Sequence, residues 1–96
     1  MTLDPQSRFK LSDKATFRSV GDNGVILNTA TGQIYSCNST AEAFLRHMDG
    51  HRDLGETADA VCGEFDIERE VLLSDLEELL TYLQSEGVLD HIDAEH

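Results

Sequence analysis

The stretch Gly24-Val-Ile-Leu-Asn-Thr-Ala-Thr-Gly-Gln-Ile-Tyr-Ser-Cys37 decides the fold, because it contains two apolar runs separated by turn residues. Residues 24–28 and 33–37 each predict a short β-strand, and the turn between them ends in a glycine. Upstream, residues 15–20 alternate in polarity, and Gly21-Asp-Asn-Gly24 predicts a second tight turn. Three strands joined by short loops predict an antiparallel meander.

The sequence after Asn38 has the pattern of three helices. Ser39-Thr-Ala-Glu42 and Asp53-Leu-Gly-Glu56 both fit a capping box, in which the first side chain caps the helix and the glutamate reaches back. Asp49-Gly50 ends the first helix, and the third is expected from near Asp66 to Gly87. Six leucines of the third helix fall within an arc of about 120°: Leu72, Leu73, Leu76, Leu79, Leu80 and Leu83. We therefore expect an α+β domain, a three-stranded antiparallel meander followed by three helices.

The chain of 96 residues has room for one domain, which we expect over residues 15–89. Residues 1–14 are polar and predict an N-terminal arm, partly mobile, that Phe9 and Leu11 can pin to the domain. Residues 90–96 predict an acidic tail.

Charge is distributed unevenly along the chain and bears on the choice of partner. The formal net charge is −12, with +1 on residues 1–52 and −13 on residues 53–96. Nucleic-acid binding depends on neutralising phosphates with Lys and Arg, so nucleic acid is a poor partner. The apolar runs are too short for a membrane span, and neither a CxxC nor a signal peptide is present. We expect a cytoplasmic protein without membrane association.

No catalytic, cofactor or metal motif is visible in the sequence. His47 and His51 have a spacing of four, but Asp49-Gly50 interrupts the helix that would align them on one face. Cys37 and Cys62 fit small core residues, and the acidic pairs of the third helix fit an exposed face. We expect a protein that is not an enzyme and that uses no cofactor and no metal.

The third strand of the meander, Gln33–Cys37, is expected at a sheet edge. It carries no Lys, no Pro and no charge, which are the usual protections of such an edge. An extended peptide can add to an unprotected edge, with backbone hydrogen bonds supplying affinity. The alternative is that the N-terminal arm or a dimer partner covers it.

Several short segments, in their order and spacing, resemble the PqqD family. They are Val25–Asn28, Gly32–Asn38, Ala41 with Ala43, Asp49-Gly50, Glu56–Val61, Leu72–Leu83 and Gly87–Leu89. The resemblance covers about residues 16–89. Cys37 stands where the family usually has leucine, and Ala58 where a larger aliphatic is common, which indicates a divergent member.

The resemblance implies a winged-helix-like domain that recognises ribosomally made precursor peptides. Such a protein resembles a chaperone that binds the leader segment and presents the core to a modifying enzyme. In pyrroloquinoline quinone biosynthesis that enzyme is a radical S-adenosylmethionine protein, and in lasso-peptide pathways a leader protease fills this place.

The resemblance also implies a binding site in which the leader adds to the third strand and packs against the third helix. The strand residues are then Gln33, Ile34, Tyr35, Ser36 and Cys37. The helical wall is drawn from one flank of the leucine arc: Arg69, Leu73, Glu77, Leu80 and Gln84. Which flank of the helix faces the peptide stays open. The acidic helices favour a leader that contains Lys or Arg.

Two alternative functions remain open at this point. A small winged-helix DNA-binding regulator has compatible elements, but it needs a basic recognition helix that none of these segments offers. A structural subunit would bury its open edge strand by dimerisation, and the sequence does not distinguish a monomer from a dimer.

Overall fold

The computed structural model describes residues 6–92 and contains five strands and three helices over that range. In chain order they are β1 (Arg8–Leu11), β2 (Ala15–Val20), β3 (Asn23–Asn28), β4 (Ile34–Cys37), α1 (Ser39–His47), α2 (Leu54–Glu64), α3 (Arg69–Ser85) and β5 (Leu89–Ile92). Strands β2, β3 and β4 form an antiparallel sheet in that order, and β1 pairs with β5 in a second sheet. The expected α+β architecture of a three-stranded meander followed by three helices is confirmed.

Two tight turns set the register of the meander. The first consists of Gly21, with a φ of +63°, and Asp22, whose φ is negative, which is the combination found in a type II′ turn. In the second, the Asn28 side chain accepts hydrogen bonds from two turn amides, and Gly32 has a φ of +80°. This register places Ile26 at the centre of the sheet, on the face that packs against the helices.

The second sheet joins a segment of the expected N-terminal arm to the last residue of the expected domain and the first residues of the expected tail. Strands β1 and β5 are antiparallel, with Phe9 opposite His91 and Leu11 opposite Leu89. Phe9 is 2% exposed and belongs to the core, so residues 8–11 are part of the domain. The pairing unites the two ends of the chain, which no local pattern predicts. The beginning of the expected arm, residues 1–5, and the end of the expected tail, residues 93–96, lie outside the described residues.

The helix starts agree only in part with the sequence expectation. In α1 the N-cap is Asn38, whose side chain accepts from the Ala41 amide, so Ser39 is the first helical residue and not the cap. In α2 the expected capping box between Asp53 and Glu56 is present. Helix α3 begins at Arg69 and ends at Ser85, slightly inside the expected range.

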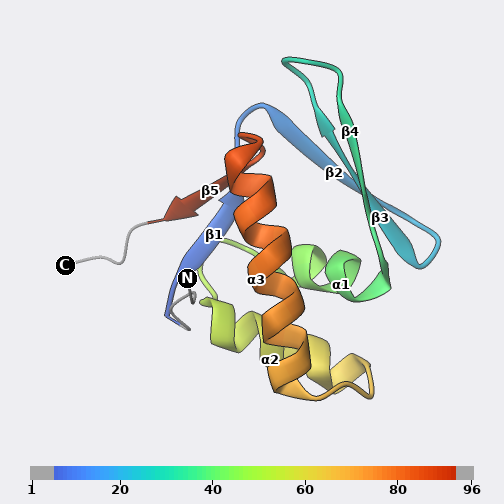
Figure 1. The fold of residues 1–96 in the computed structure, drawn as a ribbon, viewed down its shortest axis with the longest axis vertical. Coiled ribbons are helices and arrows are strands. Elements are labelled where there is room, and N and C mark those ends of the chain that lie inside the picture. The colour runs from blue at the N-terminus through green and yellow to red at the C-terminus, as the bar shows by residue number, and fades with distance from the viewer. Residues whose placement is uncertain (1–5, 93–96) are drawn as a thin grey trace.

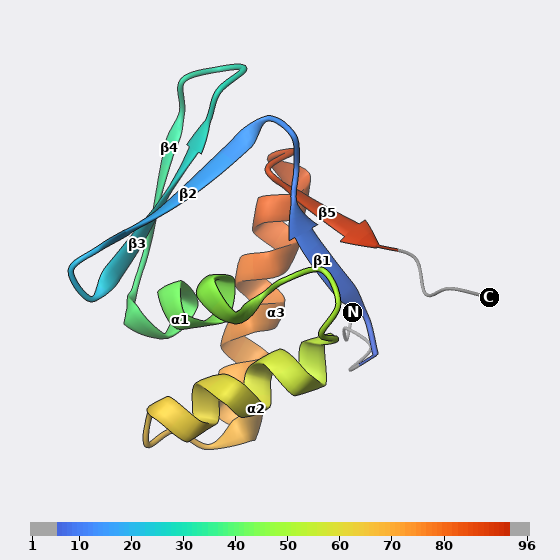
Figure 2. The same ribbon diagram turned by 180° about the vertical axis from the view of Figure 1, so that it is seen from behind.

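Helix α3 runs through the middle of the molecule and separates the two sheets (Figures 1 and 2). Helix α1 packs against β3 and α2, while α3 packs against α2 and β5. The core lies between these elements, and its largest fully buried side chains are Phe9, Phe44, Ile26, Leu72, Leu80, Leu83, Val61, Val88 and Thr57. In this winged-helix-like arrangement the side chain of Tyr35, in β4, contacts the C-terminal end of α3.

Candidate peptide-binding edge

Strand β4 is an edge strand, because β3 pairs with one side of it and no strand within residues 6–92 pairs with the other. The Asn28 amide donates to the Gln33 carbonyl at 2.8 Å, so Asn28 and Gln33 are a hydrogen-bonded pair. Hydrogen-bonded and non-hydrogen-bonded pairs alternate along an antiparallel ladder. The hydrogen-bonded pairs therefore continue at Tyr35 and Cys37. The backbone amides of Ile34 and Ser36 consequently face the open edge.

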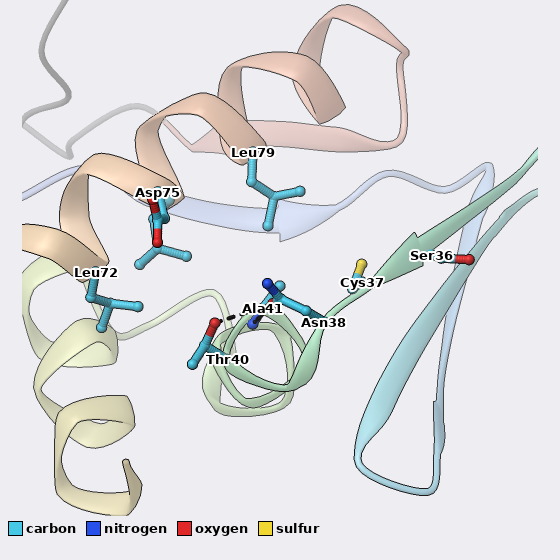
Figure 3. Close-up of a pocket in the computed structure, with 9 residues that line it drawn as sticks. Ser36, Cys37, Asn38, Thr40, Ala41, Leu72, Asp75 and Leu79 are labelled. Carbon is cyan, nitrogen blue, oxygen red and sulfur yellow. Dashed lines mark hydrogen bonds between the residues drawn. The ribbon is translucent and has the colours of Figure 1, made fainter. Parts of the chain in front are cut away.

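A pocket of about 170 Å³ lies beside this edge, between α3 and the junction of β4 with α1 (Figure 3). The strand and the start of α1 contribute Ser36, Cys37, Asn38, Thr40 and Ala41. Helix α3 contributes Leu72, Asp75, Leu76 and Leu79. The pocket therefore combines an apolar helical wall and one carboxylate with a strand edge.

Tyr35 ties the edge strand to the C-terminal end of α3. Its hydroxyl donates to the Glu86 carboxylate at 2.9 Å, and its ring meets the Tyr82 ring edge-on, with centroids 5.9 Å apart. Burial, together with the neighbouring Glu86, raises the pKa of Tyr35 above its usual value of 10.0. The hydroxyl is therefore protonated at neutral pH and holds β4 at a fixed distance from the helix.

The structure brings the five predicted strand residues together at this edge. Ile34, Tyr35, Ser36 and Cys37 form β4, and Gln33 precedes it as the residue that closes the turn. Tyr35 and Cys37 are buried toward the helices, whereas Ile34 and Ser36 are exposed. Burial raises the pKa of the Cys37 thiol, which keeps it an unreactive lining residue.

None of the five predicted helix residues lines this pocket, which borders a different flank of α3. Leu80 is 0% exposed and lies in the core. Arg69 turns toward α2, where it pairs with Asp59 at 3.3 Å and reaches the Gly55 carbonyl. Glu77 borders a shallow depression on another face of α3.

Leu73 and Gln84, the other two, are half-buried and also lie outside the pocket. The flank that borders β4 is instead the one with Asp75 and Leu79. The predicted leucine arc of α3 includes Leu79. Which edge of that arc lies next to β4 depends on the position of the sheet, which the helix pattern does not determine. No pattern in the sequence therefore indicates a role for Asp75, Tyr82 or Glu86.

A separate polar cluster joins β2, α1 and α2. The buried Glu42 accepts from the Ser19 hydroxyl at 2.6 Å and from Arg46 at 3.0 Å, and Arg46 also pairs with Glu64. Hydrogen bonds from Arg46 and His47 lower the pKa of Glu64 to about 2. These ionised groups hold the first two helices and the meander together.

The two histidines with a spacing of four, His47 and His51, contact different partners. His47 contacts the Glu64 carboxylate, whereas the His51 amide bonds to Asp49. Within residues 6–92, no three His, Cys, Asp or Glu side chains gather in a way that could hold a metal ion. In the same range, no helix has the length and apolar character required to cross a membrane.

Comparison with known families identifies the fold. The model of the family described as coenzyme PQQ synthesis protein D (PqqD) matches residues 23–89, which is more than half of the chain. The chain belongs to the PqqD family. The PqqD match begins at the first residue of β3 and ends at the first residue of β5.

A solved structure, that of TbiB1 in complex with the TbiA(β) leader peptide, has the same fold as this PqqD-family chain. The TM-score is 0.74 at 22% sequence identity, and the alignment covers 88% of this chain and 99% of that one. No significant match was found among curated protein sequences. The fold, including the meander and the three helices, is thus shared with a protein whose structure contains a leader peptide.

Proposed function

We propose that this PqqD-family chain binds the leader segment of a ribosomally made precursor peptide and presents the peptide to a modifying enzyme. The observation that carries the proposal is the open edge of β4 directly beside the pocket on α3. The amides of Ile34 and Ser36 supply free donors along that edge. The structural similarity to TbiB1, which was solved with a leader peptide, supports leader binding by this chain.

In the proposed complex, the leader adds as a fourth strand next to β4 and inserts an apolar side chain into the pocket. The strand side of the site consists of Gln33–Cys37, as the sequence predicted. The helical side takes Asp75 and Leu79 from the pocket, with Tyr82 adjoining it through its contact with Tyr35. Main-chain bonds supply affinity, and the pocket selects the side chain that faces it.

Charge favours a basic leader. Asp75 lines the pocket, Glu86 lies beside Tyr35, and neither carboxylate forms an ion pair within the described residues. A Lys or Arg in the leader can therefore pair with Asp75 and increase the encounter rate.

We infer that the chain acts by binding and not by catalysis, and that a separate enzyme performs the chemistry. A radical S-adenosylmethionine enzyme and a leader protease are the two candidate partners. Cys37 and Cys62 are free thiols, which supports a reducing, cytoplasmic setting.

The proposal is tested by fluorescence polarisation of a labelled leader from a precursor encoded beside this gene. We expect saturable binding of the leader and no binding of the scrambled peptide. A labelled DNA duplex at low salt and light scattering of the free protein test the two alternatives. DNA binding, or a stable dimer that binds no leader, would contradict the proposal.

A further inference from the structure

The face of the meander that points away from the helices carries an apolar surface that lies outside the pocket on α3. We call it the outer sheet face, and its members are Thr16, Arg18, Val20, Val25, Leu27 and Ile34. These residues surround a shallow hollow of about 310 Å³. Val20 is 57% exposed and Ile34 is 64% exposed, unusually high values for side chains of this kind.

The register explains why these side chains meet. Leu27 is opposite Thr16 on one side and Ile34 on the other, and Val25 is likewise flanked by Arg18 and Ser36. Cross-strand neighbours share one face of a sheet, so the apolar residues form one continuous patch.

The charge of this face is opposite to that of the rest of the molecule. Arg18 is the only charged member of the outer sheet face. Lys14 lies just before β2, where its carbonyl accepts from the Thr29 amide, and its spacing from Thr16 and Arg18 places it on the same side of the sheet. Neither base forms an ion pair within the described residues, whereas Arg46, Arg52 and Arg69 all do. In a chain with 19 acidic residues, a sheet face with two unpaired bases and no acid is a distinct surface.

These charges identify the kind of occupant that fits. A second copy placed face to face would bring together two surfaces whose charged groups are bases, with no carboxylate on either face to compensate. It would also bring together two chains with a net charge of −12 each. A different protein that offers apolar side chains next to Asp or Glu matches both the patch and its charge.

We propose that the outer sheet face is the docking surface for the modifying enzyme, which contacts it with an apolar surface flanked by carboxylates. This inference rests on the proposed function, because it names the partner that receives the bound peptide. A leader strand added beside β4 lengthens the same sheet. Alternate leader side chains then lie next to Ile34 on the outer sheet face. The enzyme consequently contacts the recognition domain and the leader across one continuous surface.

The geometry also predicts coupling between the two partners. If the leader extends the surface that the enzyme recognises, bound leader raises the affinity for the enzyme several-fold. Thermodynamic linkage requires the enzyme to raise the affinity for the leader by the same factor.

The test measures binding of the purified modifying enzyme encoded beside this gene to the full chain by biolayer interferometry, with and without leader. Arg18→Glu and Leu27→Gln change the outer sheet face and avoid the β4 edge. Arg8→Glu is the matched control, since Arg8 is also an exposed base without an ion pair among residues 6–92, but it lies on β1. We expect each of the first two variants to weaken enzyme binding by about tenfold, and the control to change it by less than about twofold.

Parallel measurement of leader affinity separates this inference from the proposed function. Both outer-face variants are expected to bind the leader like the unmodified chain. Enzyme binding that is absent in the unmodified chain, or equal in all variants, would overturn the docking surface while leaving leader recognition intact. Self-association that Arg18→Glu abolishes would overturn it in favour of a second copy. If the unmodified chain binds no leader but its binding to the enzyme is still weakened by Arg18→Glu, the proposed function would be contradicted and the docking surface would stand.

Discussion

The Tyr35 hydroxyl donates a hydrogen bond of 2.9 Å to the Glu86 carboxylate, which couples the edge strand β4 to the C-cap residue of α3. The two groups are 51 positions apart in the chain. Their contact sets the separation between strand and helix, and therefore the width of the site in which we place the leader.

Removing this bond is expected to cost stability. Tyr35→Phe keeps the ring and its contact with Tyr82 but deletes the donor, so the free energy of unfolding should fall by about 1 kcal/mol. Tyr82→Phe is the matched control, because no hydrogen bond of the Tyr82 hydroxyl is found in the described residues. Urea denaturation of both variants measures the difference, and equal loss in both would contradict the role of the Glu86 bond.

Ile34→Pro is expected to abolish leader binding. The Ile34 amide faces the open edge, so proline removes a donor that the leader needs while leaving the ladder with β3 unchanged. Ile34→Ala is the control, since it shortens the side chain but keeps the amide and should bind the leader. Circular dichroism checks that both variants fold, and a folded proline variant with unchanged affinity would move the site away from β4.

Two leucines of α3 test which flank of the helix faces the peptide. Leu79 and Leu73 are both half-buried, but only Leu79 lines the pocket beside β4. Leu79→Ala should weaken leader binding by about tenfold, as expected for the loss of part of an apolar contact, while Leu73→Ala should leave it nearly unchanged. The reverse result would favour the flank of Arg69, Leu73, Glu77, Leu80 and Gln84 that the sequence suggested.

Leader affinity is expected to decrease with salt if the leader is basic. Raising the ionic strength from about 0.05 to about 0.5 M shortens the Debye length and should weaken binding several-fold. Asp75→Asn should lower the affinity at low salt and reduce this salt dependence, whereas Glu70→Gln at the start of α3 should not. An affinity that does not change with salt would contradict the electrostatic contribution to leader binding, whereas strand addition at β4 would not be affected.

The Glu64 cluster predicts a defined pH dependence of stability. The pKa of Glu64 is about 2 in the folded chain, against an ordinary value of 4.5, because Arg46 and His47 bond to the ionised form. A lowered folded pKa stabilises the fold above pH 4.5, and this contribution is lost as the pH falls toward 2. The difference in urea midpoint between the unmodified chain and Glu64→Gln should therefore shrink over that range. A difference that is constant with pH would contradict this assignment.

The sequence predicted what depends on local pattern and failed where distant segments meet. Alternation and turn glycines were enough for β2 to β4, and the charge-free β4 could be recognised as an unprotected edge. The pairing of Phe9 with His91 joins the ends of the chain, so no local signal announces it. The choice between Asn38 and Ser39 as helix cap was equally local but ambiguous, because both residue types cap helices.

The side of α3 that borders the pocket was not predictable for a related reason. The leucine arc is wide enough to include both Leu73 and Leu79, and only the position of β4 decides between them. Tyr82 and Glu86 acquire their roles through contacts with Tyr35, which the sequence does not place near them. The edge strand that forms half of the proposed site could therefore be predicted from the sequence, whereas the helical flank beside it required the fold.

The most direct test of the central claim is a titration of the amide chemical shifts of the chain with the leader of a neighbouring precursor. Strand addition predicts that the largest shifts occur at Ile34 and Ser36, whose amides gain partners, with further shifts along Asp75–Tyr82. Shifts that leave β4 unaffected and gather elsewhere, or no shifts at saturating peptide, would contradict leader recognition at this edge.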